Sequence, residues 1–241
     1  MDNYLLPYLL LMAHFVSGAL WRVRINRRLN TAEAKMQWTK FLVYLLIVNL
    51  AWCCLIWEPL FFPFIGWIVI LIASAEWWKA LGKVQGRFWL ILAFLMVTGG
   101  FIGFLYMDQK LILYTYFVVV LFDGSSQIAG QLVGKRSLLP RISPRKTWEG
   151  LMGGAVITLA TTLLTRRSFS YECGELILWT AVIMAAAFTG DMLASAVKRK
   201  AKIATFGRVL PGHGGMIDRF DSLMMAGSLL YVLSLIQHWL G

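Results

Sequence analysis

Residues 111–123 read LILYTYFVVVLFD, an almost continuous apolar run that ends in an aspartate. A helix needs about 20 mostly apolar residues to cross the hydrocarbon core of a bilayer. Here the run can reach that length only by continuing past Asp123 to about residue 129. Because polar groups exposed to lipid are costly, we expect the polar end of this helix to be buried among other helices.

Seven further runs of comparable length occur along the chain. The eight predicted spans are 4–21, 41–57, 59–75, 88–106, 111–129, 150–165, 175–194 and 222–240. The second run meets the third at Trp57-Glu58-Pro59, so these two should form a tight re-entrant hairpin. The 241 residues are 59% apolar and 15% charged, whereas a soluble domain is nearer 45–50% and about 25%. The sequence therefore predicts an all-α, polytopic transmembrane helical bundle.

Basic residues lie in alternate loops. Loops 22–40, 76–87, 130–149 and 195–221 hold 20 of the 23 Lys and Arg residues, which leaves three for the other loops. By the positive-inside rule the four basic loops are cytoplasmic and both termini lie on the opposite side. We expect a multi-pass protein of the cell inner (cytoplasmic) membrane, with its active site facing the cytoplasm.

The net charge of +11 bears on the partners. In a soluble protein it would suggest nucleic acid, but here the charges form short blocks between apolar runs, so nucleic acid is not expected. Anionic lipid headgroups or a polyphosphate fit these blocks better. We divide the chain into spans one to four, residues 1–110, and a region with polar motif loops, 111–241, within one integrated membrane domain.

Four of the six aspartates fall at the predicted cytoplasmic face: Asp123, Asp191, Asp218 and Asp221. Asp123 and Asp191 end long apolar runs, and an ionisable group at that depth is a functional-site hypothesis. The alternative for each is a salt bridge to a nearby Lys or Arg. Asp218 and Asp221 are spaced i,i+3, which places both on one helix face. Paired carboxylates suit Mg²⁺, although such pairs also occur on solvated helix faces.

A glycine-rich turn, Pro211-Gly212-His213-Gly214-Gly215, precedes this pair. Glycines let the backbone approach a phosphate and turn its N–H groups toward it. His213 is either a ligand or phosphate contact, or a hydrogen-bonded structural residue. The basic run upstream anchors the topology and would also neutralise a triphosphate.

A second cytoplasmic cluster contains Ser143, Lys146, Thr147 and Glu149 at the entrance to span six. Helix N-terminal N–H groups favour anions there. The preceding Gly130-x-x-x-Gly134-Lys135 superficially resembles a P-loop, but its spacing is wrong and no Ser or Thr follows the lysine. We reject that interpretation.

These motifs resemble those of a known family. SAVKR at 195–199, ATFG at 204–207 and PGHGGMIDRFD at 211–221 are similar to the signature of phosphatidate cytidylyltransferases, also called CDP-diacylglycerol synthases. SPRKTWEG at 143–150, Gly190-Asp191, and Asp123 with its following small residues resemble the family's other motifs. The resemblance covers roughly residues 120–225.

The resemblance implies an enzyme that joins CTP and phosphatidic acid, or a related lipid phosphate, into CDP-diacylglycerol and releases pyrophosphate. It implies a Mg²⁺ centre on Asp191, Asp218 and Asp221, with the choice between one and two cations left open. Lys198 and Arg199 join these carboxylates as catalytic residues. Substrate contacts are expected from Asp123, Ser143, Lys146, Thr147, Glu149, Ser195, Gly212, His213, Gly214, Gly215 and Arg219. Membrane lipid is an expected partner, and a homodimer is among the open oligomeric states.

The chain departs from the family pattern at two places. Ala204-Thr205 stands where the family usually has Lys-Asp, and Ala194 where it usually has an acidic residue. These departures keep two alternatives open. One is a cytidylyltransferase for another lipid phosphate, such as an isoprenoid one, and the other is a non-catalytic homologue that binds lipid headgroups.

Overall fold

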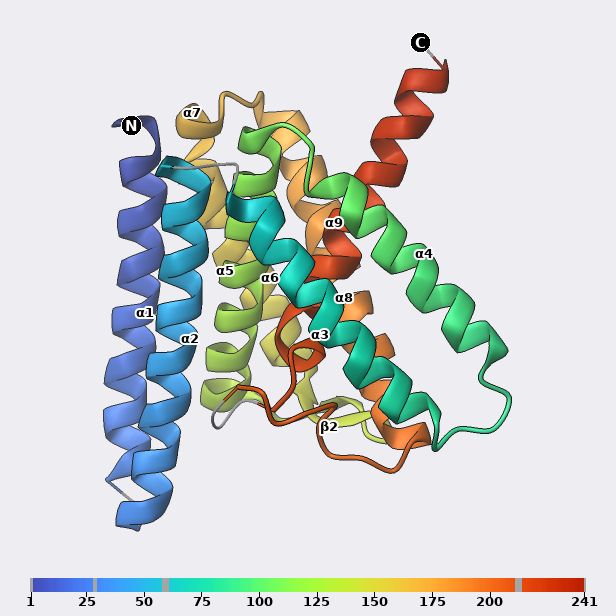
Figure 1. Ribbon diagram of the computed structural model, residues 1–241. Helices are drawn as coiled ribbons and strands as arrows, with labels where there is room; N and C mark the ends of the chain where they lie inside the picture. Colours follow the sequence, from blue (N-terminus) through green and yellow to red (C-terminus); the bar gives the residue numbers. More distant parts are fainter. Residues whose placement is uncertain (1, 28–29, 58–60, 211–213, 241) are drawn as a thin grey trace. The chain divides into compact units, whose positions relative to one another are not determined.

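The computed structural model describes residues 2–27, 30–57, 61–210 and 214–240. The regular secondary structure of these residues is helical apart from one small sheet, which confirms the predicted all-α class (Figure 1). The helices are η1 (Asp2–Tyr4), α1 (Leu5–Asn26), α2 (Thr31–Trp57), α3 (Phe61–Leu81), α4 (Phe88–Phe104), α5 (Gln109–Val133), α6 (Trp148–Leu164), α7 (Arg166–Phe169), α8 (Cys173–Lys200) and α9 (Ile217–Leu240). Strands β1 (Ser137–Leu139) and β2 (Ser143–Thr147) pair antiparallel within the predicted loop 130–149.

Each of the eight predicted spans falls largely on a helix. Six helices, α1, α2, α3, α5, α8 and α9, are long and apolar enough to cross a membrane. Helices α4 and α6 are apolar but have only 17 residues each. That length is about 26 Å at 1.5 Å per residue, against a hydrocarbon core of about 30 Å. The helices are confirmed, and the count of eight spans stays a prediction. The hairpin predicted around Glu58 and Pro59 lies outside the described residues.

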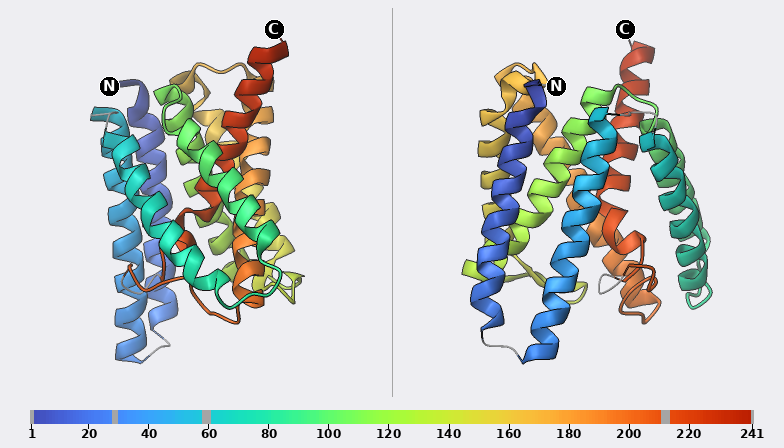
Figure 2. Two further views of the ribbon diagram at one scale, coloured as in Figure 1. Left: turned by 45° about the vertical axis from the view of Figure 1, so that its right-hand side comes forward. Right: turned by 60° about the vertical axis from the view of Figure 1, so that its left-hand side comes forward.

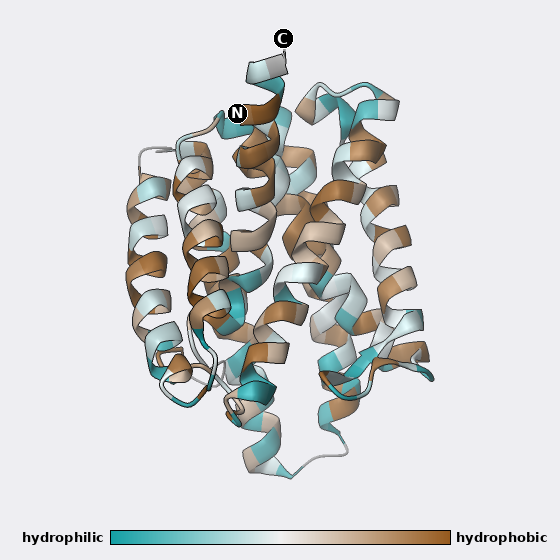
Figure 3. Cartoon of the chain, turned by 90° about the vertical axis from the view of Figure 1, so that its right-hand side faces the viewer, coloured by the Kyte–Doolittle hydropathy of each residue, from teal (hydrophilic) through white to brown (hydrophobic). Residues whose placement is uncertain are grey.

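Large apolar side chains face outward along these helices. Leu20 and Leu46 are each 67% exposed and Leu71 is 68% exposed, and hydrophobic residues recur along the helices in Figure 3. In water a surface of this kind would drive association, whereas a bilayer solvates it. The structure therefore agrees with a membrane protein.

The chain forms two compact units, each built from two segments. The first unit is Met1–Leu50 with Phe117–Met184, and the second is Ala51–Tyr116 with Ala185–Gly241. Helices α2, α5 and α8 continue from one unit into the other. Each unit contains residues from both predicted regions, 1–110 and 111–241. That predicted division therefore describes the sequence and stays a prediction.

In the first unit, α1 lies antiparallel to the first part of α2 (Figure 2). The Tyr8 hydroxyl donates to Asn49 Oδ1 at 2.7 Å, and Arg22 Nη1 donates to Gln37 Oε1 at 2.9 Å. Helix α6 packs closely on α5, because a Cβ on Gly154 would lie 2.8 Å from the Ser126 Cα.

In the second unit, α4 packs along α9. A Cβ on Gly100 would lie 2.9 Å from the Ser228 Cβ, so the small residue permits the approach, as in other membrane helix pairs. The Trp67 Nε1 of α3 donates to the Tyr106 hydroxyl at 3.0 Å. Helices α3 and α9 of this unit contact the loop that joins α8 to α9, which carries the polar residues described below.

Candidate functional site

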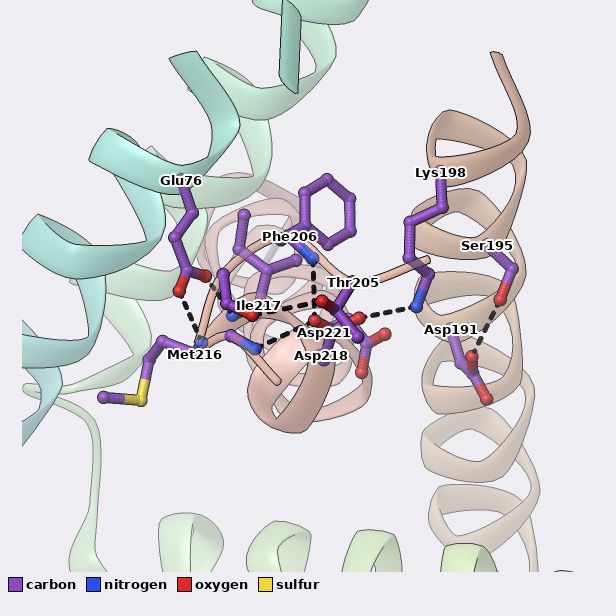
Figure 4. Close-up of polar contacts among 12 residues, drawn as sticks. Glu76, Asp191, Ser195, Lys198, Thr205, Phe206, Met216, Ile217, Asp218 and Asp221 are labelled. Carbon is purple, nitrogen blue, oxygen red and sulfur yellow. Dashed lines mark hydrogen bonds and ion pairs between the residues drawn. The ribbon is translucent and has the colours of Figure 1, made fainter. Parts of the chain in front are cut away.

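Asp218, in the first turn of α9, organises the loop that joins α8 to α9 (Figure 4). Its Oδ1 lies 2.7 Å from the Lys198 Nζ, and its side chain is only 5% exposed. Its Oδ2 accepts the backbone N–H groups of Phe206 at 2.9 Å and Gly215 at 3.0 Å. Three donors thus bind one carboxylate, which ties the end of α8, the middle of the loop and the start of α9 together.

Glu76, near the end of α3, binds the same loop from the other side (Figure 4). Glu76 is only 5% exposed. Its two carboxylate oxygens accept the backbone N–H groups of Met216 at 3.0 Å and Ile217 at 3.1 Å. The first N–H groups of a helix have no partner within the helix, and a negative charge is favourable at that end. Glu76 therefore fixes where α9 begins.

Sequence reasoning missed Glu76, because it was counted with the basic loop 76–87. The signal was present, since Glu76 follows directly on a long apolar run, as Asp123 and Asp191 do. A Cβ on Gly207 or Gly215 would collide with the Glu76 carboxylate. Both glycines are thus required for the close approach of the loop to α3.

An aromatic stack holds the loop beside this carboxylate. Phe206 lies 5.8 Å from Trp77 between ring centroids, and Trp77 stacks on Phe94 at 4.8 Å. The Lys198 Nζ lies 5.6 Å from the Phe206 ring centroid, within the range of a cation–π contact. Consecutive residues of α3, Glu76 and Trp77, therefore hold the loop by polar and apolar contacts together.

Asp191 and Asp221 come from the facing helices α8 and α9. A Cβ on Gly190 would lie 2.5 Å from the Asp221 carbonyl oxygen, so the two backbones approach closely at this level. The Ser195 hydroxyl, one turn along α8, donates to Asp191 Oδ1 at 3.3 Å. Asp221 Oδ1 accepts the N–H of Ser222 at 2.8 Å. Both aspartates are half-buried.

The other predicted residues of this region take several positions. Gly214 has a φ of +89°, which favours glycine, and Gly215 gives its N–H to Asp218. Gly212 and His213 lie outside the described residues. Arg199 and Arg219 are exposed, and so are Ala204 and Thr205, where the chain departs from the family pattern.

The second predicted cluster belongs to the first unit. Glu149 Oε2 accepts the backbone N–H groups of Lys135 at 3.0 Å and Arg136 at 3.1 Å. Glu149 lies just outside the predicted span 150–165. Its pKa is lowered because backbone N–H groups donate hydrogen bonds to the carboxylate, first that of Lys135 and then those of Glu149 itself and Arg136. Thr147 caps α6, since its Oγ1 accepts the Gly150 N–H at 3.1 Å.

For the remaining members of that cluster the structure gives the position and the burial. Ser143 pairs with Leu139 across the β1–β2 hairpin. Lys146 is half-buried on β2, and Asp123 is half-buried on α5. Printed contacts join Asp191 to Ser195 and Lys198 to Asp218 in the second unit, where the backbone of Gly190 also approaches Asp221. Asp123, Ser143, Lys146, Thr147 and Glu149 all belong to the first unit.

No ready-made metal cage is present in the described ranges, because no three His, Cys, Asp or Glu side chains there converge on one point. This agrees with the contacts of Asp218, whose two oxygens already accept three donors. Mg²⁺ is usually bound through one or two carboxylates, completed by substrate phosphates and water. Asp191 and Asp221, which lie on facing helices, could supply these one or two carboxylates.

Two comparisons with known proteins bear on this site. The sequence profile of the cytidylyltransferase family matches residues 4–236. The phosphatidate cytidylyltransferase of Staphylococcus haemolyticus is 40% identical over 140 residues, which are 55% of this chain and 54% of that protein. The protein of the same name from Staphylococcus saprophyticus is 39% identical over 140 residues, with the same coverage.

The Staphylococcus aureus protein of that name is 38% identical over 124 residues, 51% of this chain and 48% of the relative. The chain thus spans about half the length of the relatives that it matches. The family profile, by contrast, extends over nearly all of the chain. This chain belongs to the cytidylyltransferase family.

Proposed function

We propose that the chain is a phosphatidate cytidylyltransferase, which makes CDP-diacylglycerol and pyrophosphate from CTP and phosphatidic acid. The observation that carries this proposal is the network around Asp218, which ties Lys198, Phe206 and Gly215 of the motif to one carboxylate. The names of the matched Staphylococcus relatives support the choice of substrates.

The reaction joins two anions. An oxygen of the lipid phosphate attacks the α-phosphorus of CTP, the bond from that phosphorus to the bridging oxygen breaks, and pyrophosphate leaves. Catalysis of such transfers is mainly positioning and neutralisation of charge, and no side-chain nucleophile is needed. The residues of this chain therefore have to supply positive charge at a fixed place.

Lys198 is a cation that a buried carboxylate holds in place. Its ammonium group has three N–H donors, and Asp218 accepts one of them at 2.7 Å. We assign the other two to a substrate phosphate. Arg199 and Arg219 are exposed nearby in the sequence and add charge that attracts CTP.

The roles of the three aspartates then separate. Asp191 and Asp221 are the residues that would hold Mg²⁺. The ion would draw charge from the phosphate oxygens and from the leaving pyrophosphate. Asp218 acts as a positioning residue, because its carboxylate binds Lys198 and two backbone N–H groups of the loop.

The position of the site in the membrane is also a proposal. Its support is the concentration of 20 of the 23 basic residues in four alternate loops, which by the positive-inside rule favours cytoplasmic loops and eight spans in an inner membrane. Cys173 would then lie on the outer side. A membrane-impermeant maleimide should label Cys173 in intact cells, and labelling only in inverted vesicles would contradict this topology.

The reaction itself is tested with purified full-length chain, labelled CTP, Mg²⁺ and a panel of lipid phosphates in detergent. We expect labelled CDP-diacylglycerol from phosphatidic acid. Product only from another acceptor, such as an isoprenoid phosphate, would replace the substrate, and the substitutions at Ala194 and Ala204-Thr205 are the feature that favours it. No product from any acceptor by a folded protein would favour a non-catalytic lipid-binding homologue.

A further inference from the structure

A cavity of about 170 Å³ lies in the first unit, between α1, the first part of α2 and the second part of α5. Among the described residues, none of the proposed reaction site lines it. An engineered cavity of about 150 Å³ holds one benzene molecule, so this one has room for a group the size of a phosphate. A whole nucleoside triphosphate does not fit.

Four polar residues of the lining lie toward one end of the cavity. Arg22 and Asn26 of α1, Gln37 of α2 and Gln131 of α5 all contribute to it. Arg22 follows the predicted span 4–21 directly, Gln37 precedes the span that starts at 41, and Gln131 follows the span that ends at 129. This end of the cavity therefore lies where lipid headgroups meet the hydrocarbon core.

Apolar side chains make up much of the remaining lining. Phe15, Phe41, Val120 and Ile128 contribute them, and each belongs to a predicted span, while His14 and Gln127 add further polar groups. A cavity that combines an arginine with apolar side chains matches the junction of headgroup and acyl chain in a phospholipid.

Two polar side chains of this lining lack the partners that their burial demands. In the described part of the chain, the buried Asn26 Nδ2 and Oδ1 and the buried His14 Nε2 make no hydrogen bond. A buried polar atom without a partner costs roughly 1–3 kcal/mol, so such atoms call for an explanation. Arg22, whose guanidinium has five donors, donates through Nη1 to the Gln37 side chain and carbonyl.

We infer that this cavity binds the phosphate of an anionic membrane phospholipid, with Arg22 as the charge partner of the phosphate. The start of one acyl chain of the lipid lies against the apolar side chains of the lining. The Asn26 amide donates to a phosphate oxygen, and Gln37 holds the guanidinium in place. Arginine suits phosphate because its planar fork donates two parallel hydrogen bonds. This inference concerns binding alone and does not rest on the proposed reaction.

The test is photocrosslinking of the purified full-length chain, without CTP, to phosphatidic acid that carries a diazirine in its acyl chain. Crosslinked peptides are identified by mass spectrometry. We expect labelling of peptides around Phe15, Phe41 and Ile128. A diacylglycerol with the same acyl chain should label them about tenfold less, and equimolar inorganic phosphate should not compete.

Matched variants locate the interaction. Arg22→Gln should lower the labelling about tenfold, Arg22→Lys should retain part of it, and Arg27→Gln should match the wild type. Arg27 is exposed at the end of the same helix and does not line the cavity. Asn26→Leu removes the unsatisfied amide, so it should lower labelling without lowering the melting temperature, which keeps the test decisive if Arg22→Gln does not fold.

Three results would overturn the inference. They are equal labelling by diacylglycerol, full competition by inorganic phosphate, and wild-type labelling of folded Arg22→Gln or Asn26→Leu. The variant Asp221→Asn should keep full labelling although we expect it to lose turnover. Binding at this cavity and the proposed reaction can therefore fail separately.

Discussion

Both units use a carboxylate to hold backbone N–H groups at a polar turn, but the surroundings of these carboxylates differ. In the second unit Asp218 and Glu76 are each only 5% exposed, and together they accept four backbone N–H groups and the Lys198 ammonium. In the first unit Glu149 accepts two N–H groups in a partly exposed setting. Because solvent replaces lost hydrogen bonds only at an exposed site, the buried pair should govern stability and the geometry of the reaction site far more than Glu149 does.

The largest effect is expected from Asp218→Asn. This change removes the negative charge next to Lys198 and leaves a mostly buried cation, which should cost about 3 kcal/mol of unfolding free energy. Turnover should be abolished. Thermal melting and the CTP assay measure the two effects.

Lys198→Met combined with Asp218→Asn provides the control. It removes both charges, so it should restore much of the stability lost in Asp218→Asn without restoring turnover. A double variant as unstable as the single one would show that the ion pair is not the source of the loss.

Gly215→Ala should have the next largest effect. The new Cβ would lie 2.6 Å from Glu76 Oε1, which forces the loop away from α3 at a cost of about 2 kcal/mol. Gly174→Ala is the matched control, because a Cβ there meets nothing within 4 Å. If the two variants melt at the same temperature, Glu76 does not constrain the loop.

Glu76→Gln should have a smaller effect on stability than on turnover. Glutamine can still accept a hydrogen bond, but it lacks the charge at the start of α9, a loss of about 1 kcal/mol. We expect kcat to fall at least tenfold, because the Met216–Ile217 turn positions Asp218 and Asp221. Glu175→Gln, an exposed acid in the first turn of α8, is the control. An unchanged kcat in Glu76→Gln would show that Glu76 does not position the residues of the proposed site.

The smallest effect is expected from Glu149→Gln. Its pKa lies below the ordinary value of 4.5, so the ionised side chain stabilises the turn above about pH 4.5, and this contribution is lost as the pH falls through the lowered pKa. Hydrogen exchange of the Lys135 and Arg136 amides should accelerate in Glu149→Gln at pH 7 and match the wild type below that pKa. Acceleration that is the same at both pH values would point to a cause other than the charge.

The helices could be predicted because long apolar runs require them, and each predicted span falls largely on one. The β1–β2 hairpin could not, since SPRKT and SLL carry no alternating apolar pattern over a useful length. Asp191, Lys198, Asp218 and Asp221 could be selected from spacing and resemblance. Their partners could not, because the contact between Glu76 and Met216 joins residues 140 positions apart.

Asp218 shows the same limit within a single motif. Its spacing from Asp221 indicates a metal ligand, whereas the structure surrounds it with Lys198 and two backbone N–H groups. The predicted role as a metal ligand and the proposed role in holding the loop fall on the same position of the sequence pattern, because the pattern does not record the donors around a side chain.

The most direct measurement is the initial rate of CDP-diacylglycerol formation from CTP and phosphatidic acid by Asp221→Asn, with Asp108→Asn as the control. Asp108 also accepts backbone N–H groups at a helix start, and it lies in a different loop. We predict that Asp221→Asn melts like the wild type but makes no product, while Asp108→Asn keeps the wild-type rate. A near wild-type rate in Asp221→Asn would contradict the proposed site.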